Sequence, residues 1–148
     1  MTTVLIDTNV LVYAHDRGEH AKQKHAIQVL ERLNTTGSGR LSVQCLAEFF
    51  SATTRRPTPK LTLAEAIQQA DYLARAWPVL NLSPLIVLEA ARGVRDHQMT
   101  YWDAQIWASA RLNQIPVIFS EDFNDGAMLE GVRFVNPFAT GFVLEAWA

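Results

Sequence analysis

The sequence predicts an α/β fold with a mostly parallel β-sheet, and two observations favour it. Short apolar runs rich in β-branched residues recur along the chain, as in buried strands. Longer segments with apolar residues at helical spacing separate these runs. Strands that alternate with helices are typical of parallel sheets, because a helix carries the chain back to the edge where the next strand starts.

The 148 residues have the size of one domain, which we expect to span residues 1–148. Hydrophobic residues make up 49% of the chain and charged residues 19%, which excludes a disordered protein. The net charge of -2 excludes the class of proteins that hold nucleic acid by bulk positive charge. Any polyanion must therefore be bound locally.

Cys45 is the single cysteine, which excludes an intrachain disulfide and four-thiolate zinc sites. The first residues lack the basic region of a signal peptide. No apolar run approaches the ~20 residues of a membrane span. We therefore expect a cytoplasmic protein that does not bind a membrane.

The chain up to residue 60 contains two predicted strands and three predicted helices. An apolar run at residues 4–6 predicts a buried strand that ends at Asp7, and residues 9–15 predict a short helix. The apolar positions of the second helix are Ala26, Val29, Leu30 and Leu33. Residues 41–43 predict the second strand and residues 45–50 the third helix, which ends at the prolines that follow.

The rest of the chain contains three further predicted helices and two strands. The expected helices cover residues 63–76, 84–95 and 100–112, and the expected strands residues 116–119 and 132–135. Thr62 and Glu65 have the spacing of a capping box, and Ser83 precedes Pro84 as an N-cap does. Residues 79–80 are too short to assign. The apolar tail, residues 138–148, is expected to pack back on the domain or else to contact a partner.

Four acidic residues form a candidate site, although each also has an ordinary structural explanation. These residues are Asp7, Glu48, Asp103 and Asp122. Asp7 has the position of a helix N-cap, and Glu48 that of an acid in a first helical turn. Asp103 lies three residues after Thr100, as in a capping box, and Asp122 lies in a polar loop that suits a turn former.

The predicted fold brings these acids together. Asp7 and Asp122 both follow strands at their carboxyl ends, which is the edge of a parallel sheet where ligand crevices open. Glu48 and Asp103 lie in the opening turns of helices. Asp103 also shares a helical face with apolar residues, so its carboxylate needs a partner. All four can converge on one edge of the sheet.

This convergence predicts a metal site. No basic residue close in sequence neutralises all four acids, and uncompensated like charges raise one another's pKa. A divalent cation relieves this repulsion, and carboxylate oxygens are the ligands that Mg²⁺ or Mn²⁺ prefers. Such an ion activates water and stabilises phosphoryl oxygens during an in-line displacement.

The motifs around the acids resemble those of a known family. They are Asp7-Thr8-Asn9-Val10, Leu46-Ala47-Glu48-Phe49, Tyr101-Trp102-Asp103-Ala104 and Ser120-Glu121-Asp122-Phe123. Four motifs in this order resemble a PIN-domain nuclease, in particular the toxin subunit of VapBC-type toxin-antitoxin systems. The resemblance extends over nearly the whole chain.

The resemblance implies a three-layer α/β/α sandwich around a short, mostly parallel sheet. It also implies Mg²⁺ or Mn²⁺ as cofactor, endonucleolytic cleavage of RNA, a cognate antitoxin protein that inhibits the chain, and a homodimer. The metal-site acids that it implies are Asp7, Glu48, Asp103 and Asp122. If an antitoxin exists, an Arg or Lys placed among these acids would be an economical way to inhibit them.

The resemblance also assigns supporting residues. Asn9 and Ser120 match positions that orient carboxylates and metal-bound water by hydrogen bonds. Glu121 and Asp125 crowd the last motif, so Asp125 is an alternative that supplements or replaces Asp122. The fourth acid of the site is therefore left open.

Arg55 and Arg56 are candidate RNA-binding residues. Arg55 lies seven residues after Glu48, which on one helix is nearly the same face, about 10 Å further along. Either arginine is then in a position to hold a phosphate beside the metal. The alternative is a solvated helix end whose cations complement the helix dipole.

Two other functions compete with a nuclease. Phosphatases of the haloacid-dehalogenase type carry a second Asp two residues after the acid of the first strand. Asn9 fills that place here, and an Asn cannot donate and recover a proton. The second alternative is a non-catalytic PIN-like interaction module, although such a scaffold has no need for four acids that repel one another.

Overall fold

The computed structural model describes residues 2–57 and 59–147, which contain a six-stranded sheet. The strands are β1 (Val4–Ile6), β2 (Gly39–Ser42), β3 (Val79–Leu80), β4 (Val117–Phe119), β5 (Met128–Leu129) and β6 (Val132–Val135). Their order across the sheet is β3-β2-β1-β4-β6-β5. All neighbouring strands are parallel except β5 and β6, which pair antiparallel.

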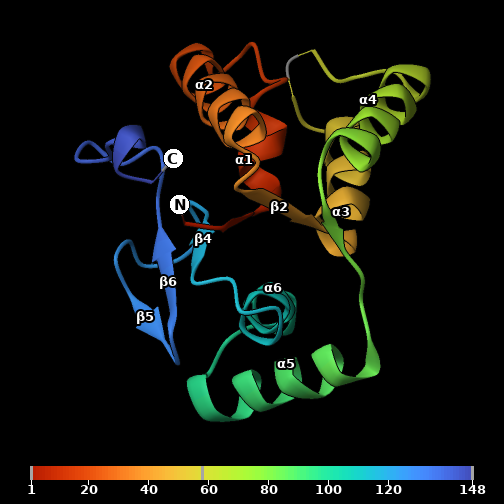
Figure 1. The fold of residues 1–148 in the computed structure, drawn as a ribbon. Coiled ribbons are helices and arrows are strands. Elements are labelled where there is room, and N and C mark those ends of the chain that lie inside the picture. The colour runs from red at the N-terminus through yellow and green to blue at the C-terminus, as the bar shows by residue number, and fades with distance from the viewer. Residues whose placement is uncertain (1, 58, 148) are drawn as a thin grey trace.

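Helices cover both faces of the sheet (Figure 1). They are α1 (Thr8–Tyr13), α2 (His20–Thr36), α3 (Val43–Thr53), α4 (Leu63–Ala76), α5 (Pro84–His97) and α6 (Tyr101–Leu112), with a short 3-10 helix η1 (Leu144–Ala146) near the end of the chain. In the view of Figure 1, α1 to α4 lie above the sheet and α5 and α6 below it. The predicted three-layer α/β/α sandwich is confirmed.

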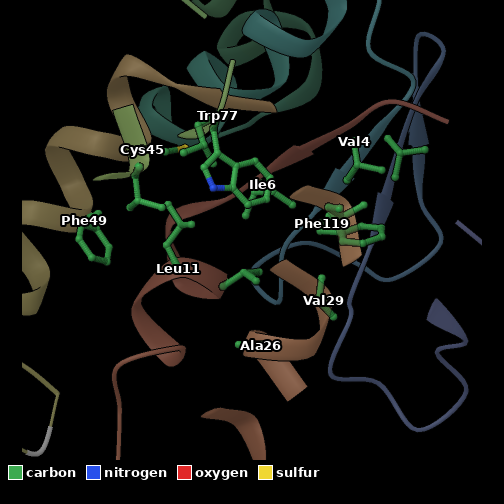
Figure 2. Close-up of a cluster of buried hydrophobic side chains, with 14 of the residues drawn as sticks. Val4, Ile6, Leu11, Ala26, Val29, Cys45, Phe49, Trp77 and Phe119 are labelled. Carbon is green, nitrogen blue, oxygen red and sulfur yellow. The ribbon is translucent and has the colours of Figure 1, made fainter. Parts of the chain in front are cut away.

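Alternation along the central strands divides the apolar residues between two cores. In β1, Val4 and Ile6 belong to the core under α1 to α4, whereas Leu5 belongs to the core under α5 and α6. In β4, Phe119 faces the first core and Ile118 the second. Figure 2 shows residues of the first core, with Ile6 and Phe119 of the sheet and Leu11 and Phe49 of the helices. Because both faces are buried, these strands are apolar at every position.

Capping residues fix where the helices begin and end, and those at the start of α4 and α5 are the ones that the sequence predicts. The Thr62 hydroxyl accepts from Glu65 N–H and the Glu65 carboxylate accepts from Thr62 N–H, which is a complete capping box. Ser83 caps α5 through Ile86 N–H. Gly37 ends α2 with φ of 72°, a left-handed conformation that glycine adopts without strain.

The sheet differs from the prediction in several details, since β2 already begins at Gly39 and β4 begins only at Val117. The second strand ends at Ser42 and does not include Val43, because the Ser42 hydroxyl accepts from Cys45 N–H and starts α3. The sequence did not predict β5, which pairs with β6 through Leu129 and Val132. Residues 79–80, left unassigned, form the edge strand β3.

The apolar tail packs back on the domain, as expected. Its residues in contact with the first core are Phe138, Phe142, Leu144 and Trp147. The Phe119 ring in β4 contacts the Phe142 ring edge-on, with centroids 5.4 Å apart. Among the described residues, no helix has the length and apolar character that crossing a membrane requires.

Candidate active site

A pocket of about 370 Å³ opens where β1 and β4 end. All four predicted acids line it, although they come from four segments: Asp7 follows β1, Glu48 is on α3, Asp103 is on α6, and Asp122 follows β4. Parallel strands bring Asp7 and Asp122 to the same edge of the sheet. The structure thus places together the acids that the sequence singles out.

Asp7 is the most buried acid of the pocket, with 3% of its surface exposed. Its Oδ1 accepts from Thr8 N–H at 2.7 Å, so the expected N-cap role, on α1, is confirmed. Its Oδ2 accepts from the Ser120 hydroxyl at 2.6 Å. Burial raises the pKa of Asp7 to about 7, the nearby Asp122 and Glu48 carboxylates add to this rise, and the two hydrogen bonds oppose it.

Asn9 and Ser120 connect the acids of the two strand ends. The Asn9 side-chain nitrogen lies 3.3 Å from Asp7 Oδ2, 3.1 Å from Ser120 Oγ and 3.1 Å from Asp122 Oδ2. Ser120 Oγ also accepts from Asp122 N–H at 3.1 Å. Donors on Asn9 and Ser120 therefore fix the orientation of both carboxylates.

Glu48 and Asp103 line the pocket from two different helices. Glu48 is exposed in the second turn of α3, so its alternative explanation as a first-turn acid is wrong. Asp103 is half-buried in the first turn of α6. The Thr100 side chain makes no capping hydrogen bond, so a complete capping box does not account for Asp103.

The structure separates Asp125 from the pocket. Its Oδ1 accepts from Asn136 N–H at 2.8 Å, which ties the loop after β4 to the end of β6. Asp122 and Glu121 line the pocket, and Asp125 does not. Of the two acids that the sequence left open, the structure places Asp122 beside Asp7.

Arg55 and Arg56 also line the pocket, for a reason that differs from the expected one. The sequence placed Arg55 on the helix of Glu48, but α3 ends at Thr53. The backbone then turns, and Arg55 Nε donates to Ser51 O at 2.9 Å. Both arginines follow the helix end and bring positive charge to an acidic pocket.

Sequence reasoning missed Tyr13, Gln44 and Lys22. Tyr13 and Gln44 line the pocket, and Lys22 lies beside it, where both Lys22 and Tyr13 contact Glu121. Gln44 Nε2 donates to Trp102 O at 3.0 Å and so links α3 with α6. Tyr13 follows Asn9 by four residues, which places both on one face of α1, so helical spacing was a signal that could have found it.

The chemistry of the pocket suits a hard divalent cation. Its predicted ligands are carboxylate oxygens, and among the described residues no ion pair joins Asp7, Glu48, Asp103 or Asp122 to a basic side chain. Within the same residues, no three Asp, Glu, His or Cys side chains are grouped so that they could hold an ion together. Mg²⁺ commonly binds one or two carboxylates directly and keeps several waters, so it does not need three grouped side chains.

Comparison with solved structures finds the same fold in several proteins. The chain is similar to a chain of a toxin-antitoxin complex from Klebsiella pneumoniae, with 19% identity and a TM-score of 0.68 over 92% of this chain and 98% of that chain. It is similar to VapC20 of Mycobacterium tuberculosis, a sarcin-ricin loop cleaving toxin, with 20% identity and a TM-score of 0.65 over 88% and 99%.

A third similar structure is DNA-bound VapBC from Salmonella typhimurium, with 18% identity and a TM-score of 0.64 over 90% of this chain and 97% of that chain. At these identities the likeness shows a shared fold. A comparison with curated proteins finds no match. The model of the PIN domain family matches residues 4–124, a range that includes all four candidate acids. With this match over most of its length, the chain belongs to the PIN domain family.

Proposed function

We propose that this chain is a metal-dependent endoribonuclease that hydrolyses RNA phosphodiester bonds, and that it is the toxin of a toxin-antitoxin pair. One observation carries the proposal: Asp7, Glu48, Asp103 and Asp122, from four separate segments, line one pocket together with two arginines. Membership of the PIN domain family supports it. The solved structures of similar fold include a toxin described as cleaving the sarcin-ricin loop.

The acids available to Mg²⁺ or Mn²⁺ are Asp7, Glu48, Asp103 and Asp122, of which one or two would bind the ion directly and the others through its waters. When bound, such an ion supplies activation of water and stabilisation of charge on the phosphoryl oxygens. Asp7 suits the role of a direct ligand because donors from Thr8 and Ser120 fix its two oxygens. Its buried carboxylate also gains the most from a neighbouring positive charge.

Residues around the acids orient the substrate and the ligands. Asn9 and Ser120 keep the carboxylates of Asp7 and Asp122 in place through hydrogen bonds. Arg55 and Arg56 are suited to bind a phosphate of the RNA backbone, because a guanidinium presents paired N–H donors to phosphate oxygens. The pocket can therefore attract RNA locally although the chain is acidic overall.

The proposed partners are a cognate antitoxin and a second copy of the chain. Two of the similar structures are a toxin-antitoxin complex and a DNA-bound VapBC assembly, which supports an antitoxin partner. An apolar groove next to the pocket, lined by Val43, Leu82 and Trp102, offers a surface for protein contact. Basic antitoxin residues inserted among the acids would compete with the metal for them.

The phosphatase alternative gains no support from the site. Its second acid would have to donate a proton from the position of Asn9. The Asn9 amide instead donates hydrogen bonds to Asp7 and Asp122, a role that an ionised Asp cannot fill. The geometry favours the nuclease.

The test is cleavage of RNA by the purified chain with Mg²⁺ or Mn²⁺. We expect cleavage that stops with a chelator and falls at least about a hundredfold in Asp7→Asn and in Asp103→Asn, because each change removes a charge from the metal site. The exposed Asp71 on α4 lies outside the pocket, so Asp71→Asn is the matched control. Unaltered cleavage by Asp7→Asn and Asp103→Asn would overturn the proposal.

A further inference from the structure

Lys22, Tyr13 and Glu121 form a closed group of contacts beside the pocket. Lys22 Nζ donates to Glu121 Oε2 at 2.9 Å and to Tyr13 Oη at 3.2 Å. The Tyr13 hydroxyl donates to Glu121 Oε1 at 2.5 Å. Both oxygens of Glu121 are thus occupied by donors from α1 and α2.

Glu121 and Asp122 are adjacent acids on one loop, and both line the pocket. Their partners differ in charge. Asp122 accepts from the neutral Asn9 amide, whereas Glu121 has the Lys22 ammonium as its partner. The negative charge of Asp122 is therefore available to bind a cation, whereas that of Glu121 is already balanced by Lys22.

We propose that Lys22 and Tyr13 hold Glu121 out of the metal-binding set, so that this loop contributes Asp122 and the Lys22–Glu121 pair adds no net charge to the pocket. The inference rests on the proposed function, since it concerns which acids bind the metal. It makes Lys22 and Tyr13 positioning residues that act through Glu121.

The ion pair of Lys22 with Glu121 is partly buried, which helps to keep Glu121 bound to Lys22. The side chains of Lys22 and Glu121 are 38% and 22% exposed, so solvent screens their attraction less than it does for a fully exposed pair. Lys22 Nζ also lies 4.7 Å from the centroid of the Tyr13 ring. That ring packs edge-on against Phe138, with centroids 5.1 Å apart, which fixes the hydroxyl that reaches Glu121.

The Mn²⁺ affinities of single and double variants distinguish this role from a purely structural one, because each variant changes the charge beside the pocket in a different direction. In Lys22→Met, Glu121 regains an unbalanced charge and becomes free to approach the cation, so metal affinity should rise. In Glu121→Gln, Lys22 is left as an unbalanced positive charge, so affinity should fall. In the double variant the neutral pair is replaced by two neutral side chains, and affinity should return to the wild-type value.

The experiment is calorimetric titration of the full chain with Mn²⁺ in the absence of RNA. We expect affinity to rise about threefold to tenfold in Lys22→Met, to fall by a similar factor in Glu121→Gln, and to lie within about twofold of wild type in the double variant. Lys22→Arg, which keeps the charge, should bind Mn²⁺ as wild type does. Lys24→Met, an exposed lysine on the same helix, is the matched control.

Weaker binding in Lys22→Met, Glu121→Gln and the double variant alike would overturn the inference, because it would show that the group only stabilises the loop. Unchanged affinity in Lys22→Met would overturn it as well. If the wild-type chain binds no Mn²⁺, both this inference and the metal dependence of the proposed function fail. If the wild-type chain binds Mn²⁺ but the affinities of the variants do not change in the expected directions, the inference alone fails.

Discussion

Asn9 and Asp122 are 113 residues apart in the chain, yet the Asn9 side-chain amide donates a 3.1 Å hydrogen bond to Asp122 Oδ2. The same nitrogen contacts Asp7 Oδ2 at 3.3 Å. One amide therefore joins the acids that follow β1 and β4. The pocket depends on this bridge because the two carboxylates repel each other and have no basic partner among the described residues.

Removing the bridge should weaken the metal site. We expect Asn9→Ala to lower Mn²⁺ affinity and RNA cleavage about tenfold to hundredfold, as loss of a group that orients a ligand commonly does. Calorimetry and a cleavage assay measure the two effects separately. The exposed Asn81 provides the matched control, Asn81→Ala, which should behave as wild type. A folded Asn9→Ala chain with wild-type metal affinity would contradict the role given to Asn9.

The raised pKa of Asp7 should make stability depend on pH. The pKa of Asp7 is about 7 in the folded chain against an ordinary value of 3.8, so the folded chain holds a proton that the unfolded chain releases. The free energy of unfolding should therefore fall as pH rises between these two values. Below both values, Asp7 imposes no such cost.

Asp7→Asn tests this linkage in the presence of a chelator. At about pH 8 the variant should be more stable than wild type by about 2–4 kcal/mol, because it buries no charge. At about pH 4 the advantage should disappear. Urea denaturation at both pH values measures it, and equal stability of the two chains at the higher pH would refute the linkage. Added Mg²⁺ should stabilise wild type more at the higher pH, where Asp7 is ionised.

Asp122 and Asp125 offer a matched pair of substitutions in one loop. Asp122→Asn should lower cleavage at least about tenfold, because it removes a charge that faces Asp7 in the pocket. Asp125→Asn should leave cleavage unchanged, because Asp125 lies outside the pocket and an amide oxygen can still accept from Asn136 N–H. Cleavage rates of the two variants under identical conditions decide this. A greater loss in Asp125→Asn would reverse the assignment.

The sequence predicted most of the site because of where parallel strands end. Asp7 and Asp122 each follow a buried strand, so a parallel sheet had to bring them to one edge. The choice between Asp122 and Asp125 needed the structure, because only the position of Asn136 shows that Asp125 is used elsewhere. The ion pair of Lys22 with Glu121, across 99 residues, has no local signal at all.

The strand β5 escaped prediction although its turn has a signal. Glu130 and Gly131 connect β5 to β6 with φ of 48° and 85°, as a type I′ turn requires at both central positions. Glycine at the second position is typical of this turn, but Glu130 is an unusual first residue because side chains rarely adopt positive φ. Two residues of strand were too few for a periodic pattern.

Arg55 and Arg56 should contribute to RNA affinity through phosphate contacts. We expect the double variant Arg55→Gln/Arg56→Gln to bind single-stranded RNA more weakly. The slope of log affinity against log salt concentration is negative, and it should become shallower by about 1.4, or 0.7 for each lost phosphate contact. Filter binding at several salt concentrations, with Ca²⁺ in place of Mg²⁺ to slow cleavage, measures the slope. Arg133→Gln, on β6 and outside the pocket, is the control. An unchanged salt dependence would contradict phosphate binding and favour the alternative, in which both arginines are solvated and complement the dipole of α3.

Gly93 controls the spacing of α5 and α6. A Cβ at Gly93 would lie 2.8 Å from Trp107 Cζ3, closer than a Cβ normally approaches another atom, and Trp107 is fully buried, so the ring cannot turn away into solvent. We expect Gly93→Ala to lower the free energy of unfolding by about 1–3 kcal/mol, because this overpacking outweighs the gain in helix propensity. Thermal denaturation measures the loss. Gly141→Ala, where a Cβ meets no atom within 4 Å, should be close to neutral. Since α6 carries Asp103, a stable Gly93→Ala chain would show that this helix can shift without cost, and Mn²⁺ titration of that chain would then report whether the pocket follows.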